Sequence, residues 1–312
     1  MTGLQKGNVK TCEQLLQEFS VRSVQVEKIR FSGVGEKDVY NITAPFEDEG
    51  ELVIAGRVEA RDSEHSQVHF FVERGGQWIP RENAPVFELQ DPFFTKIASE
   101  LVLGGVQIFP HATLAGQLGW RTVLYRGKSI AELTEFAKGP NGMKDLRLIE
   151  LKDGTIGVLT RPQGEKGGRG KIGWTRISSL AELSIEVINK APLLEGQFID
   201  EQWGGCNEPH LLAHGLVGVL GHIANFDTEG NRHYYPMVFA LDPDTGEISD
   251  MKLIAVRSQF LPGPAKRPDL IDVVFSGGLV RQADGNAVLY AGISDAEAQK
   301  MILPDPFLQY ER

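Results

Sequence analysis

The chain has 312 residues, of which 41% are hydrophobic and 24% are charged, an ordinary balance for a globular protein with a sizeable core. Its net charge of −10 has the wrong sign for wrapping the phosphate backbone of a nucleic acid. Cys12 and Cys206 are too few for a disulfide framework, and no apolar run approaches the roughly 20 residues of a membrane span. The N-terminal sequence has no apolar stretch typical of a signal peptide, so we expect a cytoplasmic protein without a nucleic-acid or membrane partner.

One helix is clearly indicated, near the start of the chain. Thr11 and Gln14 have the spacing of a capping box, and apolar residues follow with a helical period, which predicts a helix over about 11–19. Further short helices are predicted over 129–136 and over 294–301.

Almost every other segment alternates between apolar and polar residues and is bounded by turn signals, a pattern that predicts β-strands. The 35 glycines and 16 prolines punctuate these segments. The clearest predicted strands, in chain order, are Glu51–Val58, Gln67–Glu73, Leu101–Phe109, Thr155–Thr160, Leu216–Ile223, Tyr235–Leu241 and Ala287–Ile293. The sequence therefore predicts an all-β fold.

A weak repeat also runs along the chain. Motif-like patches, each followed by a strand, a turn and another strand, recur at Asn41, Asp91, Asp145, Glu208 and Asp272. Four antiparallel strands need about this much chain, so five such units account for the length. We expect a single-domain five-bladed β-propeller over residues 1–312, with blades at about 33–80, 85–128, 140–190, 200–255 and 265–300. The periodicity alone leaves a β-sandwich or a β-helix open.

The first two patches contain groups suited to a sugar. Asn41 has an amide that can bond sugar hydroxyls, and Arg57 has a rigid fork of donors. In the alternative interpretation Asn41 shapes a turn and Arg57 belongs, with Glu59, to a solvated charged face. Asp91, followed by proline and aromatic residues, is a candidate acid with a raised pKa, although an Asp-Pro turn explains the same residues.

The later patches add cations and a histidine. Lys144 and Arg161 fall on one predicted antiparallel pair, and two cations that converge in a cleft suit a phosphate group. The alternative is an exposed, salt-bridged hairpin. His222 ends an apolar strand and has a core residue as its alternative interpretation, Tyr234 follows on the next strand, and Asp295 comes where a later strand ends.

Three other motifs do not support a cofactor. Residues 164–171 lack the glycine and the Ser/Thr of a phosphate-binding loop and are interpreted as a flexible hairpin loop. Residues 242–246 lack the ligands of a calcium loop, and the histidines show no metal-site spacing. We therefore expect no metal and no organic cofactor.

Taken together and in this order, the patches resemble those of two related enzyme families, over about residues 33–297. They resemble the β-mannoside phosphorylases of glycoside hydrolase family 130. They are still more similar to the β-1,2-mannosyltransferase/phosphorylases of glycosyltransferase family 108, because Gln90, Phe93 and Gly221 depart from the family 130 pattern. Both families are five-bladed propellers.

The resemblance implies roles for particular residues. Asp91 corresponds to the catalytic acid. The residues implied to bind sugar are Asn41, Arg57, Asp145 and Asp295. The residues implied to bind phosphate are Lys144, Arg161, His222 and Tyr234.

The expected activity is inverting mannosyl transfer to or from phosphate. Asp91 supplies a proton through the 3-hydroxyl of the sugar, and phosphate attacks the anomeric carbon from the opposite face to give α-mannose 1-phosphate. The expected partners are thus a small sugar or oligosaccharide and inorganic phosphate as co-substrate, with a nucleotide-sugar donor as a further option. Two alternatives remain open: a glycoside hydrolase on the same propeller, and a non-catalytic carbohydrate-binding propeller.

Overall fold

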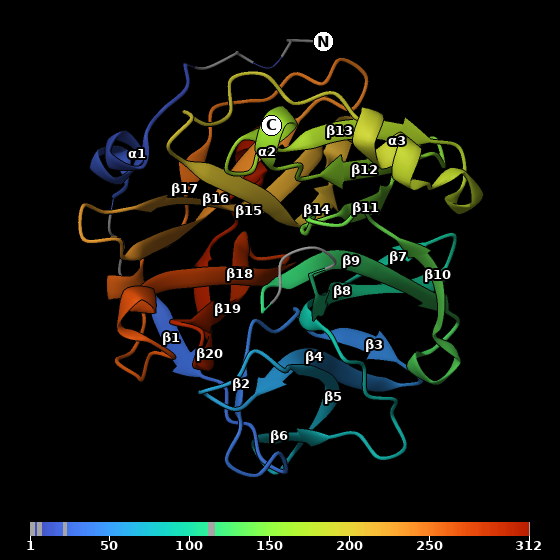
Figure 1. Cartoon of the computed structure of the whole chain (residues 1–312), viewed down its shortest axis with the longest axis vertical. Coiled ribbons are helices and arrows are strands. Elements are labelled where there is room, and N and C mark those ends of the chain that lie inside the picture. Colours follow the sequence, from blue (N-terminus) through green and yellow to red (C-terminus); the bar gives the residue numbers. More distant parts are fainter. Residues whose placement is uncertain (1–3, 5–7, 21–23, 112–115, 312) are drawn as a thin grey trace.

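The computed structural model describes residues 4, 8–20, 24–111 and 116–311, and its regular structure is almost entirely β (Figure 1). The α-helices in this part of the chain are short: α1 (Cys12–Glu18), α2 (Gly164–Gly167) and α3 (Ile185–Lys190). The 3-10 turns are η1 (Ile130–Glu132), η2 (Leu180–Glu182), η3 (Ala213–Gly215), η4 (Arg257–Gln259), η5 (Pro268–Leu270) and η6 (Leu308–Tyr310). The predicted all-β class is confirmed. No helix in the described ranges is long and apolar enough to cross a membrane.

Helix α1 begins as its sequence predicts. The Thr11 hydroxyl accepts a hydrogen bond from the Gln14 backbone N–H at 3.2 Å, and the Gln14 side chain accepts one from the Thr11 N–H at 2.9 Å. This reciprocal capping box satisfies donors that the first turn leaves free. Leu15 and Cys12 are buried against the strands below, so packing of one face completes the helix.

The strands follow one another in five antiparallel groups. The first group is β2 (Asp38–Tyr40), β3 (Phe46–Asp48), β4 (Glu51–Glu59), β5 (Gln67–Arg74) and β6 (Gln77–Pro80). The second is β7 (Gln90–Ile97), β8 (Glu100–Pro110), β9 (Leu118–Gly127) and β10 (Thr134–Lys138). The third is β11 (Arg147–Glu150), β12 (Ile156–Thr160) and β13 (Gly173–Ile177). The fourth is β14 (Trp203–Leu211), β15 (Val217–Phe226), β16 (Arg232–Leu241) and β17 (Lys252–Leu253). The fifth is β18 (Asp272–Arg281), β19 (Asn286–Ile293) and β20 (Glu297–Pro304).

Two pairings connect groups that are distant in the sequence. Strand β1 (Gln25–Lys28) pairs antiparallel with β20, so the start of the chain forms the outer strand of its last group. Strands β16 and β18 pair in parallel at two positions, His233 with Asp272 and Tyr234 with Val273, which joins the fourth and fifth groups into one sheet of eight strands. Neighbouring groups are also in contact through one strand of each, namely β4 with β7, β7 with β11, β11 with β14 and β14 with β18. In Figure 1 the groups accordingly lie around the middle of the molecule.

The hydrophobic core is divided among the interfaces between neighbouring groups. Each of the clusters found in the described ranges combines residues of two groups. Representative pairs are Ile54 with Ala298, Phe70 with Leu103, Leu124 with Val158, Leu159 with Val219, and Val238 with Leu289. Apolar burial of this kind stabilises by about 25 cal/mol per Å², so each group depends on both of its neighbours.

The seven predicted strands correspond to β4, β5, β8, β12, β15, β16 and β19, most of them longer than the sequence pattern indicated. Two predicted helices are wrong. Within 129–136 only η1 is helical, and β10 follows because it pairs with β9. Within 294–301 the chain turns and then forms β20, whose backbone pairs with β19 on one side and β1 on the other. Tertiary pairing thus overrides weak local propensity.

The segment 164–171 also differs from the flexible loop that was predicted. It contains the single helical turn α2, and the backbone groups of Gly164 and Gly168 bond each other. The Lys166 ammonium donates to the Ala191 carbonyl at 2.6 Å, and Lys171 pairs with Asp200 at 2.9 Å. The segment is therefore fixed to its surroundings.

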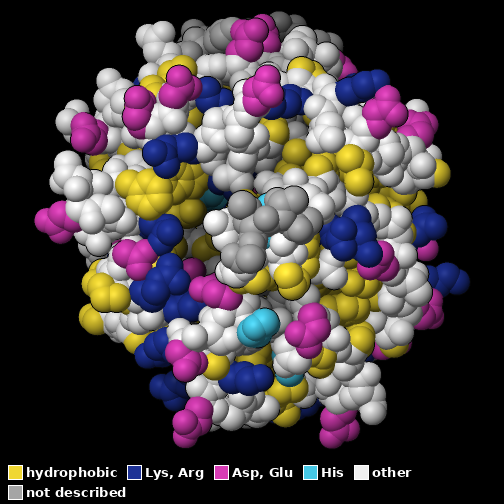
Figure 2. Space-filling model, viewed as in Figure 1, with side chains coloured by type: hydrophobic (Ala, Val, Ile, Leu, Met, Phe, Trp, Pro, Cys, Tyr) yellow, Lys and Arg dark blue, Asp and Glu magenta, His cyan; other side chains and the backbone are white. Residues whose placement is uncertain are grey.

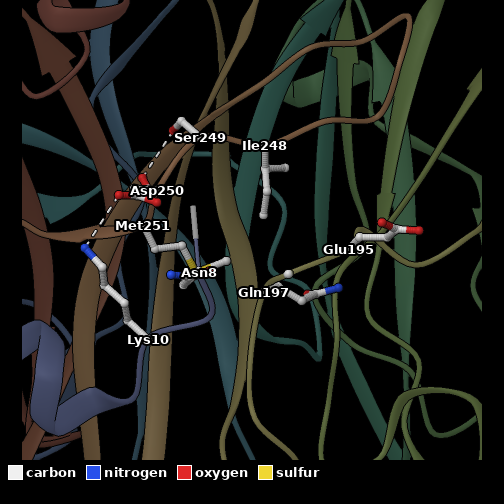
Figure 3. Close-up of a pocket in the computed structure, with 9 residues that line it drawn as sticks. Asn8, Lys10, Glu195, Gln197, Ile248, Ser249, Asp250 and Met251 are labelled. Atoms are coloured by element: carbon white, nitrogen blue, oxygen red, sulfur yellow. Dashed lines mark hydrogen bonds and ion pairs between the residues drawn. The ribbon is translucent and has the colours of Figure 1, made fainter. Parts of the chain in front are cut away.

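A small cavity lies between the N-terminal segment and residues 195–197 and 248–251 (Figure 3). Lys10 pairs with Asp250 beside it at 3.5 Å. The cavity volume is about 10 Å³, which is room for about one water molecule. This cavity is too small for a sugar or a phosphate.

Candidate active site

Asp91 lies at a bulge in β7, where the register with β8 shifts between Gln90 and Phe93. A bulge redirects a side chain out of the regular alternation. Asp91 is 9% exposed, and its carboxylate meets two donors from the first group. The Asn41 Nδ2 donates to its Oδ1 at 2.8 Å, and the Arg57 Nη1 donates to the same oxygen at 3.1 Å. One carboxylate is thus held by an amide and a guanidinium.

Asp295 is the second carboxylate of this cluster. It follows β19 directly, and its Oδ1 accepts from the Asn41 Nδ2 at 3.4 Å. Asn41 therefore bridges two carboxylates that lie 204 positions apart in the sequence, numbers 91 and 295. We refer to Asn41, Arg57, Asp91 and Asp295 as the carboxylate cluster.

The environment shifts the two carboxyl groups in opposite directions. Burial raises the pKa of Asp91, but the charges of Arg57 and Lys144 and the donated hydrogen bonds outweigh burial and lower the pKa below its usual value. Burial, reinforced by the charge of Asp91, raises the pKa of Asp295. The sequence-based expectation of a raised pKa at Asp91 is therefore wrong for the free protein, because two cations and an amide donor surround the carboxylate.

Three residues of the carboxylate cluster, and Asp145 nearby, share an unusual backbone conformation. The φ angles are positive at Asn41 (45°), Asp91 (48°), Asp145 (59°) and Asp295 (50°). This left-handed region is uncommon for residues other than glycine, although Asn and Asp tolerate it best. Strained backbone of this kind persists where the surrounding structure enforces it, and it gathers at functional sites.

A second cluster lies at the open end of the β11–β12 hairpin. Because Arg147 pairs with Leu159, Lys144 and Arg161 both fall just beyond this end. Arg161 is 2% exposed, its Nε donates to the Gly204 carbonyl at 2.9 Å, and its Nη1 lies 3.2 Å from the Asp145 carboxylate. The alternative of an exposed hairpin is wrong, since the arginine is buried.

Asp145 belongs to this second cluster as well. Burial raises its pKa, but the charge of Arg161 and the other basic groups prevail and lower the pKa to about 2. The carboxylate therefore stays ionised and partly neutralises Arg161. Lys144 connects the two clusters, because its charge acts on both Asp91 and Asp145.

His222 faces this cation group from β15. Its Nδ1 lies 2.8 Å from the Oδ1 of Asn207, and its ring stacks on Tyr234 with 5.3 Å between ring centres. Burial, together with Arg161 and Lys144, lowers the pKa of His222 to about 3 despite the opposing charge of Asp145. The imidazole is therefore neutral. We refer to Lys144, Asp145, Arg161, His222 and Tyr234 as the cation cluster.

Asn207 and Arg147 are site residues to which sequence reasoning gave no role. Asn207 is the bulged residue of β14, is 1% exposed and orients His222. Arg147 is 2% exposed, donates to the Asn207 carbonyl at 2.7 Å and stacks 3.7 Å from the centre of the Phe93 ring. Asn207 opens one of the recurring patches, and Arg147 closes the sequence Lys-Asp-Leu-Arg. Their positions in these two sequence patches are the only features of the sequence that pointed to a role in the site.

A pocket of about 350 Å³ opens over the cation cluster. Its charged lining residues are all basic: Lys144, Arg161, Arg169 and Arg232. Aromatic side chains form much of the remainder, and Trp203 donates through Nε1 to the Tyr234 hydroxyl at 3.0 Å. Figure 2 shows this side of the molecule hollowed near its centre, with basic side chains beside the hollow. In a protein of net charge −10, such a lining is suited to an anion.

Several buried polar atoms of the site make no hydrogen bond within the described part of the chain. They include the Asn41 Oδ1, the Asn207 Nδ2 and the Trp120 Nε1. Buried polar groups are nearly always bonded in folded proteins, so unpaired ones beside a pocket are suited to a ligand. In the described ranges no three His, Cys, Asp or Glu side chains gather as metal ligands would.

The chain matches the profile of one protein family, described as "protein of unknown function (DUF1861)", over residues 17–309. The chain belongs to this family. No curated protein matches it in a sequence comparison.

Solved structures extend this result. A mannose phosphorylase from Leishmania mexicana, in complex with phosphate ion, is similar with a TM-score of 0.89 and 35% identity, over 96% of this chain and 95% of that one. A GDP-Man-dependent mannosyltransferase from the same organism has a TM-score of 0.88 and 33% identity, over 97% and 96% of the two chains. These identities place the chain in one family with both proteins, so the predicted resemblance is confirmed.

More distant structures agree in fold. A β-1,2-mannobiose phosphorylase from Listeria innocua has a TM-score of 0.62 and 14% identity, over 95% of each chain. At this identity the likeness concerns the fold alone.

Proposed function

We propose that the protein is an inverting mannoside phosphorylase and mannosyltransferase that acts on β-1,2-linked mannosides, with phosphate and α-mannose 1-phosphate as co-substrate and product. The observation that carries the proposal is the position of Asp91, which is held by Asn41 and Arg57 and feels the charge of Lys144. Lys144 and Arg161 line the basic pocket. The activities of the two Leishmania relatives support the same chemistry.

In phosphorolysis, phosphate binds at Lys144 and Arg161, with His222 and Tyr234 beside it. A phosphate oxygen attacks the anomeric carbon as the bond to the leaving sugar breaks. The proton of Asp91 passes through the 3-hydroxyl to the leaving oxygen, so the released sugar carries a hydroxyl group. Holding the anion in line with the reacting carbon supplies proximity and charge stabilisation.

The lowered pKa of Asp91 fits both directions of this reaction. In synthesis an ionised carboxylate is the required form, because it accepts the proton of the acceptor hydroxyl. In phosphorolysis Asp91 must take up a proton first. Bound phosphate offsets the charge of Lys144, which is one of the groups that lower this pKa, and therefore favours protonation.

A nucleotide sugar is a second candidate donor, and the pocket lining favours it. Beyond Lys144 and Arg161, the guanidinium of Arg169 lies over the Phe226 ring at 5.5 Å and near Trp203 at 5.9 Å. These cations and aromatic faces suit a diphosphate joined to a base. A GDP-mannose donor assay compares wild type with Arg169→Ala; equal rates would exclude this use of the arginine.

The arrangement of the fold and its surroundings completes the proposal. We interpret the five strand groups as the blades of a single-domain β-propeller, in which β1 completes the last blade by pairing with β20. The buried free thiols of Cys12 and Cys206 support a cytoplasmic location, where thiols stay reduced. The reaction as drawn needs no metal, organic cofactor, nucleic acid or membrane.

A panel of β-linked mannobioses, incubated with and without phosphate, tests the main proposal. We expect mannose 1-phosphate to be released from the β-1,2-linked substrate only when phosphate is present. Release of free mannose at equal rates without phosphate would instead identify a glycoside hydrolase. Binding without cleavage of any substrate would identify a carbohydrate-binding protein.

A further inference from the structure

We infer that Glu59, at the end of β4, is a positioning residue that fixes Arg57 and, through Arg57, the catalytic Asp91. The inference rests on the function proposed for Asp91. In the alternative interpretation of the sequence Glu59 lies on a solvated charged face, whereas in the structure it is 1% exposed. Its hydrogen bonds go to residues other than Asp91.

Both oxygens of Glu59 are fully engaged. Oε1 accepts from the Tyr40 hydroxyl at 2.7 Å and from the Lys266 ammonium. Oε2 accepts from the Arg57 Nη2 at 2.7 Å and Nε at 3.2 Å, and from the Ser66 hydroxyl. We refer to these five residues, Tyr40, Arg57, Glu59, Ser66 and Lys266, as the Glu59 network.

The Glu59 network decides where the Arg57 guanidinium points. A guanidinium is planar with donors in a rigid fork, so fixing Nε and Nη2 on one carboxylate also fixes Nη1. The Nη1 is the atom that reaches Asp91, at 3.1 Å. The Tyr40 ring, 4.9 Å from the guanidinium carbon, supports one face of the group. Without Glu59 the fork loses two of its anchors.

Glu59 also balances charge near Asp91. Burial raises the pKa of Glu59, but Arg57 and the hydrogen bonds from Lys266, Ser66 and Tyr40 prevail and lower it, so the group is ionised. The charged groups that act on Asp91 are Arg57 from β4, Lys144 before β11, Arg147 from β11 and Asp295 after β19. Lys266 acts on Asp295. Removing the negative charge of Glu59 leaves the positive charges of Arg57 and Lys266 less compensated, which lowers the pKa of Asp91 further.

A purely structural role does not explain this composition. Buried ion pairs stabilise little, and well-packed apolar residues of similar volume often serve equally well. Lys266 reaches Glu59 across 207 positions, from the segment between η4 and η5, and its backbone N–H bonds Ser294 next to Asp295. The network therefore joins the first and fifth groups at the carboxylate cluster.

The experiment compares Glu59→Gln with a matched control, Glu64→Gln. Glu64 also contacts Lys266 (3.0 Å) and Arg57 (3.6 Å), but its side chain is 47% exposed and lies outside the fork. We expect Glu59→Gln to lower kcat of phosphorolysis about 10- to 100-fold, the cost of a misplaced group, with the KM for phosphate nearly unchanged. The rate of phosphorolysis falls as pH rises and Asp91 loses its proton, and we expect this limb of the pH profile to move to lower pH in Glu59→Gln. We expect Glu64→Gln to leave both kcat and the pH limb unchanged.

Two further measurements keep the inference testable. Ser66→Ala removes one hydroxyl that bonds both Arg57 and Glu59, and we expect a smaller effect of the same kind in a variant that folds readily. Carboxyl NMR titration follows the pKa of Asp91 without turnover, and Glu59→Gln lowers it. Unchanged kcat, pH limb and Asp91 pKa in a folded Glu59→Gln variant would overturn the inference. A wild type that releases no mannose 1-phosphate would count against the proposed function instead.

Discussion

The Asp91 side chain occupies a backbone position that few residue types accept. Its φ of 48° is left-handed, and asparagine is, besides aspartate, the residue that tolerates this conformation best. Substitution of aspartate by asparagine therefore separates the carboxyl chemistry from the local fold.

We predict that Asp91→Asn removes activity without unfolding the protein. Loss of the titrating group should reduce kcat about 10²- to 10⁴-fold, the usual contribution of general acid–base catalysis. Steady-state kinetics measure the change, and circular dichroism with phosphate binding checks the fold. Near-normal turnover in the folded variant would return Asp91 to a turn-forming role.

Arg161 allows the phosphate subsite to be tested separately from the sugar subsite. We predict that Arg161→Ala weakens phosphate binding about 10- to 100-fold, since hydrogen bonds to charged groups contribute about 1.5–3 kcal/mol. Binding of mannose should change far less. Calorimetry of the two ligands measures the difference.

The same substitution removes the nearer of the two ion-pair partners of the buried Asp145, so we expect a loss of about 3–5 kcal/mol in the free energy of unfolding. Lys144→Met, at a half-buried position, provides a milder variant of the same subsite. If Lys144→Met weakened the binding of mannose and of phosphate equally, the assignment of Lys144 to the phosphate subsite would be contradicted.

Within β14, Gly205 leaves space at the centre of the cation cluster. A Cβ at this position would lie 2.7 Å from the Asp145 Oδ2, 2.9 Å from the Arg161 Cδ and 3.1 Å from the His222 Cε1. All three neighbours belong to the cation cluster, so the strand sets their spacing through the absence of a side chain.

We predict that Gly205→Ala raises the KM for phosphate about 10-fold by displacing these groups. Overpacking should also cost about 1–3 kcal/mol in the free energy of unfolding. Gly139→Ala is the control, because its nearest neighbours lie at 3.5 Å and permit a methyl group. If both variants bind phosphate like wild type, the cluster tolerates more movement than its packing indicates.

The parallel contact between β16 and β18 contains a titrating group. Burial lowers the pKa of His233, but hydrogen bonds to Asp272 (2.6 Å) and Asp227 (3.3 Å) prevail and raise it. A raised pKa means that the charged histidine stabilises the fold below its unfolded pKa, about 6.5, and that this contribution is lost as pH rises through the folded pKa.

We therefore predict that His233→Asn lowers the free energy of unfolding more at pH 5.5 than at pH 9. Denaturant titrations at the two pH values measure the difference. The exposed His65 is substituted in the control variant, His65→Asn. A constant gap between wild type and His233→Asn would exclude the ionic contribution.

Across the whole molecule, the sequence predicted what local patterns determine. The capping box at Thr11, the alternating strands and the all-β class follow from neighbouring residues, and so does the choice of Asp91, Lys144 and Arg161 as candidates. The features that the sequence did not predict depend on partners that are distant in the chain. From its neighbours alone Glu59 resembles a surface residue, but in the fold it is covered by Lys266. The role of Asn207 depends on a bulge that places it beside His222.

The same reason explains the misassigned strand β20. Its sequence has helical as well as extended character, and the choice is made by β19 on one side and β1 on the other. Residues 25–28 and 297–304 lie at opposite ends of the chain, so no local window contains both.

The pairing of β1 with β20 also has a consequence for the order of synthesis. While the ribosome makes the chain, residues 25–28 emerge long before their partners in 297–304. Ile54 of the first group and Ala298 of the fifth belong to one core cluster, so burial of this cluster requires both groups. Contacts of such long sequence separation slow folding and leave strand edges exposed meanwhile. We expect nascent chains that end before residue 297 to remain protease-sensitive, and resistance to appear only once the last strand has been released.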